Sequence, residues 1–384
     1  MIPPASIGPL TDGPRSTGSG PKSIGIVMHD FPLGGTERIA LRLARAWDAA
    51  GVAVTIFCGN DGGPSRALVP EGARLIVAET SICRSTGSRE RLGRAAARYF
   101  AAHRVDALFV TGNFHWEIVP ALATIPQRPA IVVQISSPLV LPQRGRFLQW
   151  RFRLRMRRLL RRADLLIAMD EPGRALADAI MHRPIARTIP LPALDDNAPP
   201  PSRAAGRTIL AAGRLIRQKG FDLLIDAFAR LDDRDARLVI VGSGPEEASL
   251  RRRIERSGRG DDITLAGYAP GIGPHLDAAR LLVLPSRFEG YGAVVVEALG
   301  AGRPVIATAT TPAVGDLMTD PERGIVVPPG DVAALATAIR TLLDRPAPDP
   351  DRLADAVSAY RIGAGAQAYL AAIADAMARR GTRA

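Results

Sequence analysis

The sequence is poor in cysteine and lysine, and it lacks any long hydrophobic run. Its two cysteines, Cys58 and Cys83, exclude a disulfide framework in a chain of 384 residues and fit a reducing cytoplasm. No uninterrupted apolar run approaches the roughly 20 residues that cross a bilayer. Residues 1–22 contain too much Pro, Gly and Ser for the apolar core of a signal peptide, and we expect them to form a disordered tail.

Lysine is almost absent although the chain is strongly basic. The formal net charge is +12, and all of the 50 basic residues except Lys22 and Lys219 are arginine. Such a charge indicates a polyanionic partner: nucleic acid, an anionic membrane surface or a phosphorylated substrate. In a chain that takes arginine by default, a lysine calls for a specific explanation.

Short apolar runs alternate with segments of helical period along nearly the whole chain, which is typical of βαβ units and parallel sheets. The length is about twice that of a usual domain. We therefore predict an α/β fold of two doubly wound, Rossmann-like domains that face each other across a cleft. The predicted divisions are an N-terminal domain over 23–190, a Pro- and Ala-rich linker over 191–206, a C-terminal domain over 207–362, and over 363–384 a helix that crosses back to the first domain, with its tail. The predicted strands span residues 23–28, 52–57, 73–77, 106–110, 129–134, 164–168, 186–189, 207–212, 237–241, 262–265, 281–284, 304–307 and 324–327.

Two loops after predicted strands have the composition of phosphate sites, because ligands of doubly wound sheets bind beyond the carboxyl ends of strands. Gly34 and Gly35 precede a helix, where backbone amides can approach a phosphate; Thr36 is the expected N-cap, and a plain tight turn is the alternative. Arg214 and Lys219 follow strand 207–212. They can clamp a diphosphate without a metal, or they can be solvated charges. The rarity of lysine favours a functional role.

Three other strings argue against nucleotide cofactors and metals. The run "VGSGPEE" has Gly242 and Gly244 but places Glu247 where a dinucleotide fingerprint needs its third glycine, so it predicts only a tight turn. The strings "DRD" and "DPD", at 233–235 and 349–351, fall in predicted surface turns away from strand ends. We therefore predict neither a cofactor nor a metal site.

Two glutamates, Glu289 and Glu297, stand eight positions apart in "SRFEGYGAVVVEALGAG". Glu289 follows a strand and Glu297 lies within the first two turns of the next helix, so both are expected at the cleft. Two carboxylates there suit a polyhydroxyl ligand. The alternative is a surface loop and a carboxylate that stabilises a helix start.

Residues 143–163 form a basic amphipathic helix with nine arginines and no acidic residue. Leu148, Phe152, Met156, Leu159 and Leu160 are expected to form an apolar stripe that packs inward. Trp150, Arg151, Arg155 and Arg158 are then expected on the outer face, which suits an anionic bilayer surface; a merely solvated face is the alternative. Nucleic acid is not expected, because no recognition motif is present and aromatic residues are only 5% of the chain.

The ordered segments "GGTER", "GRLIRQKGFDLLIDAF", "LVIVGSGPE", "ITLAGY" and "PSRFEGYGAVVVEALGAGRPVIAT" resemble glycosyltransferase family 4, over about residues 23–345. The resemblance implies a GT-B fold and a retaining, metal-independent hexosyltransferase. Its donor would be a UDP- or GDP-linked sugar, and its acceptor a lipid-linked or polysaccharide glycan, as in polysaccharide or lipopolysaccharide biosynthesis. With the basic helix, it predicts peripheral association with the cytoplasmic membrane face. By position it implies that Gly35 of the Gly34–Gly35 pair contacts the donor diphosphate, which Arg214 and Lys219 neutralise. The backbone around Gly267 and Tyr268 would contact the base, and Glu297 the ribose. The sugar would be bound by Glu289 and the amides of Gly290, Tyr291 and Gly292.

One position departs from the family pattern. Many relatives carry a histidine after the strand that matches "AIVVQ", where this chain has Ser136 and Ser137. His115, after the preceding strand, and Ser136 itself are candidates to contact the sugar or the acceptor, although a lone histidine beside aromatic residues is more often structural. The departure leaves the donor sugar open. It also gives some weight to a non-catalytic sugar-nucleotide-binding or membrane-scaffold protein. An epimerase or phosphorylase of the same fold is a separate alternative; a phosphorylase would need a cofactor lysine, and Lys219, already matched to the donor diphosphate, is the only candidate.

Overall fold

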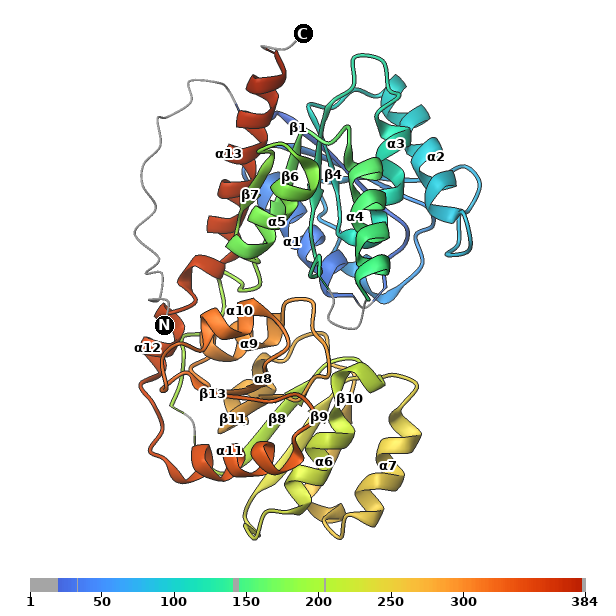
Figure 1. Ribbon diagram of the computed structural model, residues 1–384. Coiled ribbons are helices and arrows are strands. Elements are labelled where there is room, and N and C mark those ends of the chain that lie inside the picture. Colours follow the sequence, from blue (N-terminus) through green and yellow to red (C-terminus); the bar gives the residue numbers. More distant parts are fainter. Residues whose placement is uncertain (1–19, 33, 141–144, 204, 382–384) are drawn as a thin grey trace.

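The computed structural model describes residues 20–381 except for residues 33, 141–144 and 204, so most of the predicted N-terminal tail lies outside the described part. It contains two parallel β-sheets, each with helices on both faces, stacked one above the other in Figure 1. Every predicted strand is present with bounds within two residues of the prediction. The agreement arises because strands covered on both faces are nearly continuous apolar runs.

The first sheet has seven strands in the order β3-β2-β1-β4-β5-β6-β7. The chain reverses its direction of travel across the sheet between β1 and β4, which places a ligand-binding switch point beyond their carboxyl ends. The elements are β1 (Ser23–Met28), α1 (Gly35–Ala49), β2 (Ala53–Cys58), η1 (Pro64–Leu68), β3 (Arg74–Val77), α2 (Ser88–Ala102), β4 (Ala107–Val110), η2 (Asn113–Ile118), α3 (Val119–Leu122), β5 (Ala130–Gln134), α4 (Arg146–Leu160), β6 (Leu165–Ala168), α5 (Glu171–Met181) and β7 (Ala186–Thr188).

The second sheet has six strands in the order β10-β9-β8-β11-β12-β13, with its switch point between β8 and β11. Its elements are β8 (Thr208–Ala212), η3 (Arg217–Lys219), α6 (Phe221–Ala229), β9 (Arg237–Val241), α7 (Glu247–Arg256), η4 (Gly260–Asp262), β10 (Ile263–Gly267), α8 (Gly273–Ala278), β11 (Leu281–Leu284), α9 (Ala293–Gly300), β12 (Val305–Thr308), α10 (Pro312–Leu317), β13 (Gly324–Val327), α11 (Val332–Asp344), α12 (Pro350–Asp355) and η5 (Ser358–Tyr360).

The last helix, α13 (Ile362–Gly381), leaves the second domain and runs along the first (Figure 1), as predicted. Two buried polar contacts fix it there. The Trp47 indole donates to the carbonyl of Ala366 at 3.2 Å, and the Gln134 amide donates to the Tyr369 hydroxyl at 3.1 Å. The helix therefore ties the first sheet to the end of the second domain.

The apolar stripe predicted for α4 is wrong at its first position. Met156 and Leu160 are buried, but Leu148 is 57% exposed. The buried residue in that turn is Gln149, whose side-chain amide donates to the carbonyl of Leu139 at 2.6 Å. A buried carbonyl needs a donor, and this need turns the helix one position away from the hydrophobic pattern.

Candidate functional site

The predicted site residues gather at the carboxyl ends of strands beside the two switch points. In the second domain they lie at the end of β10, on the loops after β8, β10 and β11, and in α9; in the first they lie at the loops after β1, β4 and β5. The four residues predicted for the outer face lie apart from these, on α4. The two groups meet where the domains touch, since a Cβ placed on Gly290 would lie 3.1 Å from the carbonyl oxygen of Ser136.

Lys219 and Glu289 form one ion pair rather than two separate ligand contacts. Lys219 Nζ lies 2.6 Å from Glu289 Oε1, which also accepts from the Ser286 hydroxyl at 2.6 Å. The two side chains are only 18% and 6% exposed, so the charges are better shielded from solvent than in a surface pair. The Lys219 stem passes the backbone of Gly213, where an added Cβ would lie 3.3 Å from its Cε. The unbranched lysine side chain, which ends in a compact ammonium, fits beside Gly213, and this explains why the chain has a lysine here in place of its usual arginine.

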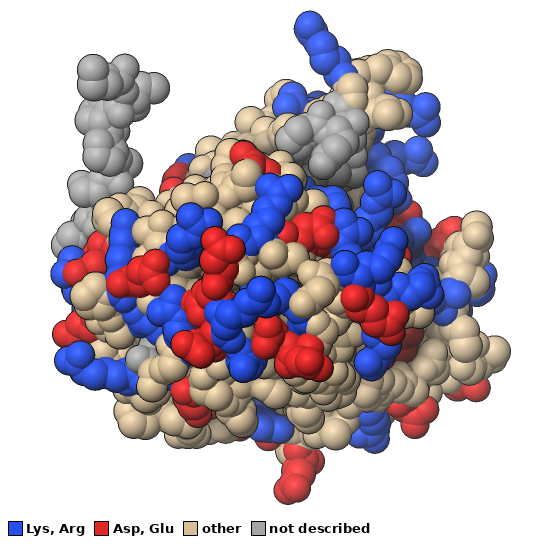
Figure 2. All heavy atoms as spheres, turned by 90° about the horizontal axis from the view of Figure 1, so that it is seen from below, with Lys and Arg blue, Asp and Glu red and all other residues tan. Residues whose placement is uncertain are grey.

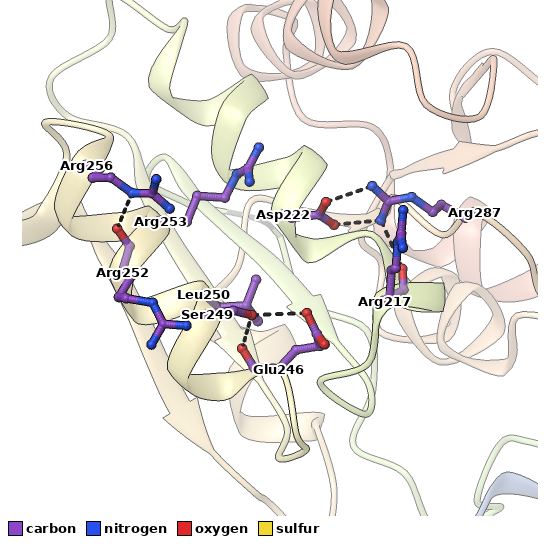
Figure 3. A pocket seen from close by; sticks show the side chains of 9 residues that line it. All are labelled: Arg217, Asp222, Glu246, Ser249, Leu250, Arg252, Arg253, Arg256 and Arg287. Atoms are coloured by element: carbon purple, nitrogen blue, oxygen red, sulfur yellow. Dashed lines mark hydrogen bonds and ion pairs between the residues drawn. The ribbon is translucent and has the colours of Figure 1, made fainter.

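Arg287, which the sequence did not single out, joins the two loops that carry this pair. Its backbone N–H donates to the carbonyl of Gln218 at 2.8 Å, and its guanidinium donates to the carbonyl of Arg217 at 2.9 Å. The guanidinium also binds both carboxylate oxygens of Asp222 at 2.7 Å (Figure 3). Burial raises the pKa of Asp222, but the hydrogen bonds from Arg287 outweigh this and lower it overall.

A pocket of about 440 Å³ lies behind these loops, against α6 and α7 (Figure 3). It is lined by five arginines, yet none of the predicted site residues borders it. Arg287 is bound to Asp222, and Arg253 is bound to both oxygens of Asp226. Much of the positive charge of this pocket is thus neutralised within the protein, and we do not take the pocket as the substrate site.

The remaining donor-side residues present accessible groups. Arg214 is exposed, and Tyr268 is 49% exposed beside Gly267, whose φ is +74°. Tyr291, in contrast, has a buried ring 6.4 Å from that of Tyr360, and burial raises the pKa of its phenol. The phenol is therefore closed to a ligand, and the contact of the amides from Gly290 to Gly292 stays a prediction.

The loop after β1 differs from the prediction in its capping. The N-cap of α1 is Gly34, without a side-chain cap, so the assignment of Thr36 is wrong. The carboxylate of Glu37 packs against Gly34: an added Cβ would lie 2.2 Å from Glu37 Oε2, so a larger residue would displace this side chain. Glu37 is in turn 3.2 Å from Arg84, which also pairs with Asp30. Gly35 is open, with nothing within 4 Å of an added Cβ.

Glu297 is also paired, with an arginine of the opposite domain. Arg38 Nη2 donates to Glu297 Oε1 at 2.7 Å. Arg38 stands in the quoted "GGTER" segment, but a run of sequence gives no sign that a residue of α1 contacts α9. In a chain with so many arginines, a single one carries no signal of its own.

His115 does not face the cleft. It is fully buried, its Nδ1 donates to the carbonyl of Thr111 at 2.7 Å, and its Nε2 accepts from the backbone N–H of His29 at 3.2 Å. With both nitrogens engaged, the ring has a structural role in place of the sugar contact expected for it. Ser136 lies beside Asn113 and is half-buried; its N–H donates to Asn113 Oδ1 at 2.8 Å.

The two DxD strings have local structural uses. Asp233 binds Arg207 and accepts from the backbone N–H of Asp235 at 3.0 Å. Asp349 caps α12, so "DPD" begins a helix and does not lie in the predicted turn. Within the described ranges, no group of three or more His, Cys, Asp or Glu side chains could hold a metal ion.

The outer face of α4 is apolar and basic at once. Phe147, Trp150 and Leu154 are 64%, 56% and 47% exposed, and the rings of Phe147 and Trp150 stack 5.9 Å apart. Arg155 pairs with Glu117, while no other arginine of α4 has an ion pair within the described part of the chain. Among the described helices, none is long and apolar enough to cross a membrane.

Comparison with known proteins identifies the family. Residues 206–345 match the family model of group 1 glycosyl transferases, and residues 34–193 match that of the glycosyl transferase 4-like domain. Together the two matches cover most of the chain, which therefore belongs to glycosyltransferase family 4.

Curated relatives align over part of their length. The chain is 36% identical to an alpha-D-kanosaminyltransferase of Streptomyces kanamyceticus over 142 residues, 36% of each chain. It is 34% identical to the lipopolysaccharide core biosynthesis glycosyltransferase LpsD of Rhizobium meliloti (strain 1021), over 39% of this chain and 45% of the relative. The chain thus aligns with less than half the length of these relatives.

Solved structures share the whole fold. The lipopolysaccharide outer core galactosyltransferase WaaB in its apo form superposes with a TM-score of 0.69 at 16% identity, over 91% of this chain and 99% of that one. The Anabaena protein Alr3699/HepE, in complex with UDP and glucose, gives 0.68 at 19% identity, over 94% and 100%. The predicted GT-B fold is confirmed.

Proposed function

We propose that the chain is a retaining glycosyltransferase that moves a hexose from a UDP- or GDP-linked donor to a lipid-linked or polysaccharide glycan. The observation that carries the proposal is the donor-side arrangement at the switch point of the second sheet. There the shielded Lys219–Glu289 pair stands on loops next to the exposed Arg214. The LpsD relative, named for lipopolysaccharide core biosynthesis, supports a glycan acceptor.

The proposed chemistry breaks the bond between the anomeric carbon and the diphosphate oxygen while the acceptor oxygen bonds to the same face of the sugar, and the acceptor hydroxyl gives its proton to the departing diphosphate. Negative charge then grows on the leaving diphosphate, and Arg214 with the Lys219 ammonium stabilises it without a metal. Glu289 has lone pairs left after its bonds to Lys219 and Ser286, and these can accept sugar hydroxyls. Tyr268 offers an exposed ring near the base, and Glu297 accepts from the ribose.

We infer further that the face of α4 holds the protein at the cytoplasmic side of an anionic membrane, where the acceptor is embedded. Trp150, with Phe147 stacked beside it, can enter the headgroup region while Arg151 and Arg158 contact anionic lipids. On the lower face of the molecule, by contrast, acidic and basic side chains are interspersed (Figure 2).

Vesicle binding tests this membrane role. Arg151→Gln with Arg158→Gln is expected to weaken binding to phosphatidylglycerol vesicles about tenfold or more, since each basic residue near an anionic surface contributes about 1 kcal/mol. The matched control, Arg252→Gln with Arg256→Gln, removes the same charge from exposed positions on α7 and should have a small effect. Equal effects of both pairs, or binding indifferent to lipid charge and salt, would reject the role.

Turnover tests the enzymatic proposal. The protein is expected to release a nucleoside diphosphate from one nucleotide-sugar, faster in the presence of a lipid-linked acceptor, and to do so equally well with EDTA. A loss of turnover in EDTA would reject the metal-independent mechanism but not the glycosyltransferase activity itself.

One observation favours the non-catalytic alternative. Ser136 and Asn113 bond to each other where relatives place a histidine at the transferred sugar. A folded protein that binds a nucleotide-sugar but never turns it over would make this alternative the better account.

A further inference from the structure

Glu297, which the proposed function places on the donor ribose, is held by a side chain of the other domain. The Arg38–Glu297 contact joins residues 259 positions apart, and the two side chains are 27% and 12% exposed. A charge-assisted hydrogen bond in such a partly shielded place is stronger than a solvent-exposed one.

Arg38 belongs to a helix that is fixed to several parts of the molecule. One turn further along α1, Arg42 donates to the carbonyl of Ala193 in the predicted linker. Trp47, on the same helix, donates to Ala366 of α13. Because one rigid helix makes all three contacts, the position of Arg38 depends on how the two domains and the linker between them are arranged.

The contact occupies only one side of the carboxylate. Arg38 binds Glu297 Oε1, and no described residue donates a hydrogen bond to Oε2. A carboxylate can accept about four hydrogen bonds, so ribose hydroxyls can bind while Arg38 stays in place. A carboxylate already held in one rotamer also loses less conformational entropy when the ligand arrives.

We propose that Arg38 is a positioning residue of the donor site. It acts through Glu297: from the opposite domain it holds one carboxylate oxygen and thereby presents the other to the ribose hydroxyls. The ribose contact is then fully formed only when the two domains are closed on each other. The inference rests on the proposed function for the identity of the ligand, but it assigns the first domain a part in recognising the donor.

The test measures discrimination between ribose and deoxyribose. UDP, GDP and ADP are first compared by calorimetry, and the tightest binder is then measured beside its 2′-deoxy and 3′-deoxy analogues. The ratio of dissociation constants, deoxy over ribo, is obtained on one sample of each variant. A partly unfolded variant lowers the active concentration for both ligands equally, so the ratio is insensitive to stability.

We expect the wild type to prefer the ribonucleotide over one deoxy analogue by about tenfold, the value of one charge-assisted hydrogen bond. Glu297→Gln should remove the preference, and Arg38→Gln should reduce it to under about threefold. Arg38→Lys, which keeps the charge but not the planar fork, should restore part of it. Arg45→Gln is the matched control: it removes an exposed arginine of the same helix that has no ion pair within the described residues, and it should retain the wild-type ratio.

Three results would overturn the inference. If Arg38→Gln keeps the wild-type ratio while Glu297→Gln loses it, Arg38 is only a strut between domains and the proposed function stands. If Arg45→Gln lowers the ratio as much as Arg38→Gln, the effect is not specific to the contact. If the folded wild type binds no nucleoside diphosphate, both the proposed function and the inference are wrong.

Discussion

The strand-end loops of the two domains differ in the groups that they leave exposed. In the first domain the charges are already matched internally: Arg84 binds both Asp30 and Glu37, and its guanidinium lies 4.5 Å from the ring of Phe114. In the second domain Lys219 pairs with Glu289 and Arg287 with Asp222, but Arg214 and Tyr268 remain exposed. The contrast supports the proposal that the donor binds at the strand-end loops of the second domain, while the membrane contact proposed for α4 lies on the exterior of the first domain.

The largest effect is expected on the donor side of this comparison. Glu289→Gln removes the charge that holds Lys219 and leaves an amide that accepts sugar hydroxyls poorly. Turnover of the nucleotide-sugar should fall about 10²–10³-fold, while binding of the free nucleoside diphosphate stays near wild type. Release of nucleoside diphosphate and calorimetry measure the two. Undiminished turnover would remove Glu289 from the mechanism.

The buried histidines of the first domain should make the unfolding free energy of the protein fall at acidic pH. Burial lowers the pKa of His29 and His115 to about 4, below the value near 6.5 of an unfolded chain. The unfolded state therefore binds protons first as the pH falls, and stability is full above about pH 6.5 and is lost progressively as the pH falls towards 4. Between pH 7 and 5 each histidine should cost about 2 kcal/mol of unfolding free energy.

Urea unfolding at both pH values checks this dependence. His29→Leu should remove about half of it, since the ring nitrogens of His29 have no partner within the described part of the chain. The exposed His182, replaced by Asn at its positive φ of 53°, is the control and should leave the pH dependence intact. A wild type equally stable at pH 5 and 7 would show that these rings are not buried and neutral.

A smaller effect is expected from the exposed cation of the second domain. Arg214→Gln should weaken binding of the nucleoside diphosphate about tenfold to a hundredfold, because one charge-assisted contact contributes about 1.5–3 kcal/mol. The melting temperature without ligand should not change, since Arg214 makes no ion pair in the described structure. Arg217→Gln, two residues before Lys219 and also exposed, is the matched control. Equal losses in both variants would mean that general charge, and not position, attracts the donor.

The smallest effect should be on stability at α4. Trp150→Ala should change the unfolding free energy by less than about 0.5 kcal/mol, because the ring is 56% exposed. Denaturant unfolding measures this, and the same variant should bind anionic vesicles more weakly. A loss above about 2 kcal/mol would show that Trp150 packs against the protein, and would weaken the assignment of this face to lipid.

Hydrophobic patterning predicted the sheets because it repeats over several residues, as the nearly coincident strands Arg237–Val241 and Leu281–Leu284 illustrate. It failed where one polar group decides the outcome, as when the carbonyl of Leu139 draws Gln149 inward and exposes Leu148. The candidate site was located by its motifs, but its pairings were not. The pairs Lys219–Glu289 and Arg38–Glu297 join side chains that are far apart in sequence. Which distant side chains contact each other depends on the tertiary fold, and no periodic pattern in the sequence indicates it.

The decisive experiment is ligand-dependent melting of the wild type and of Lys219→Gln with nucleotide-sugars and free nucleoside diphosphates, because a ligand stabilises the fold according to its affinity. We expect one nucleotide-sugar to raise the melting temperature of the wild type and to raise that of Lys219→Gln much less. No shift with any nucleotide-sugar on folded wild-type protein, or the same shift in both proteins, would contradict a donor site built around the Lys219–Glu289 pair.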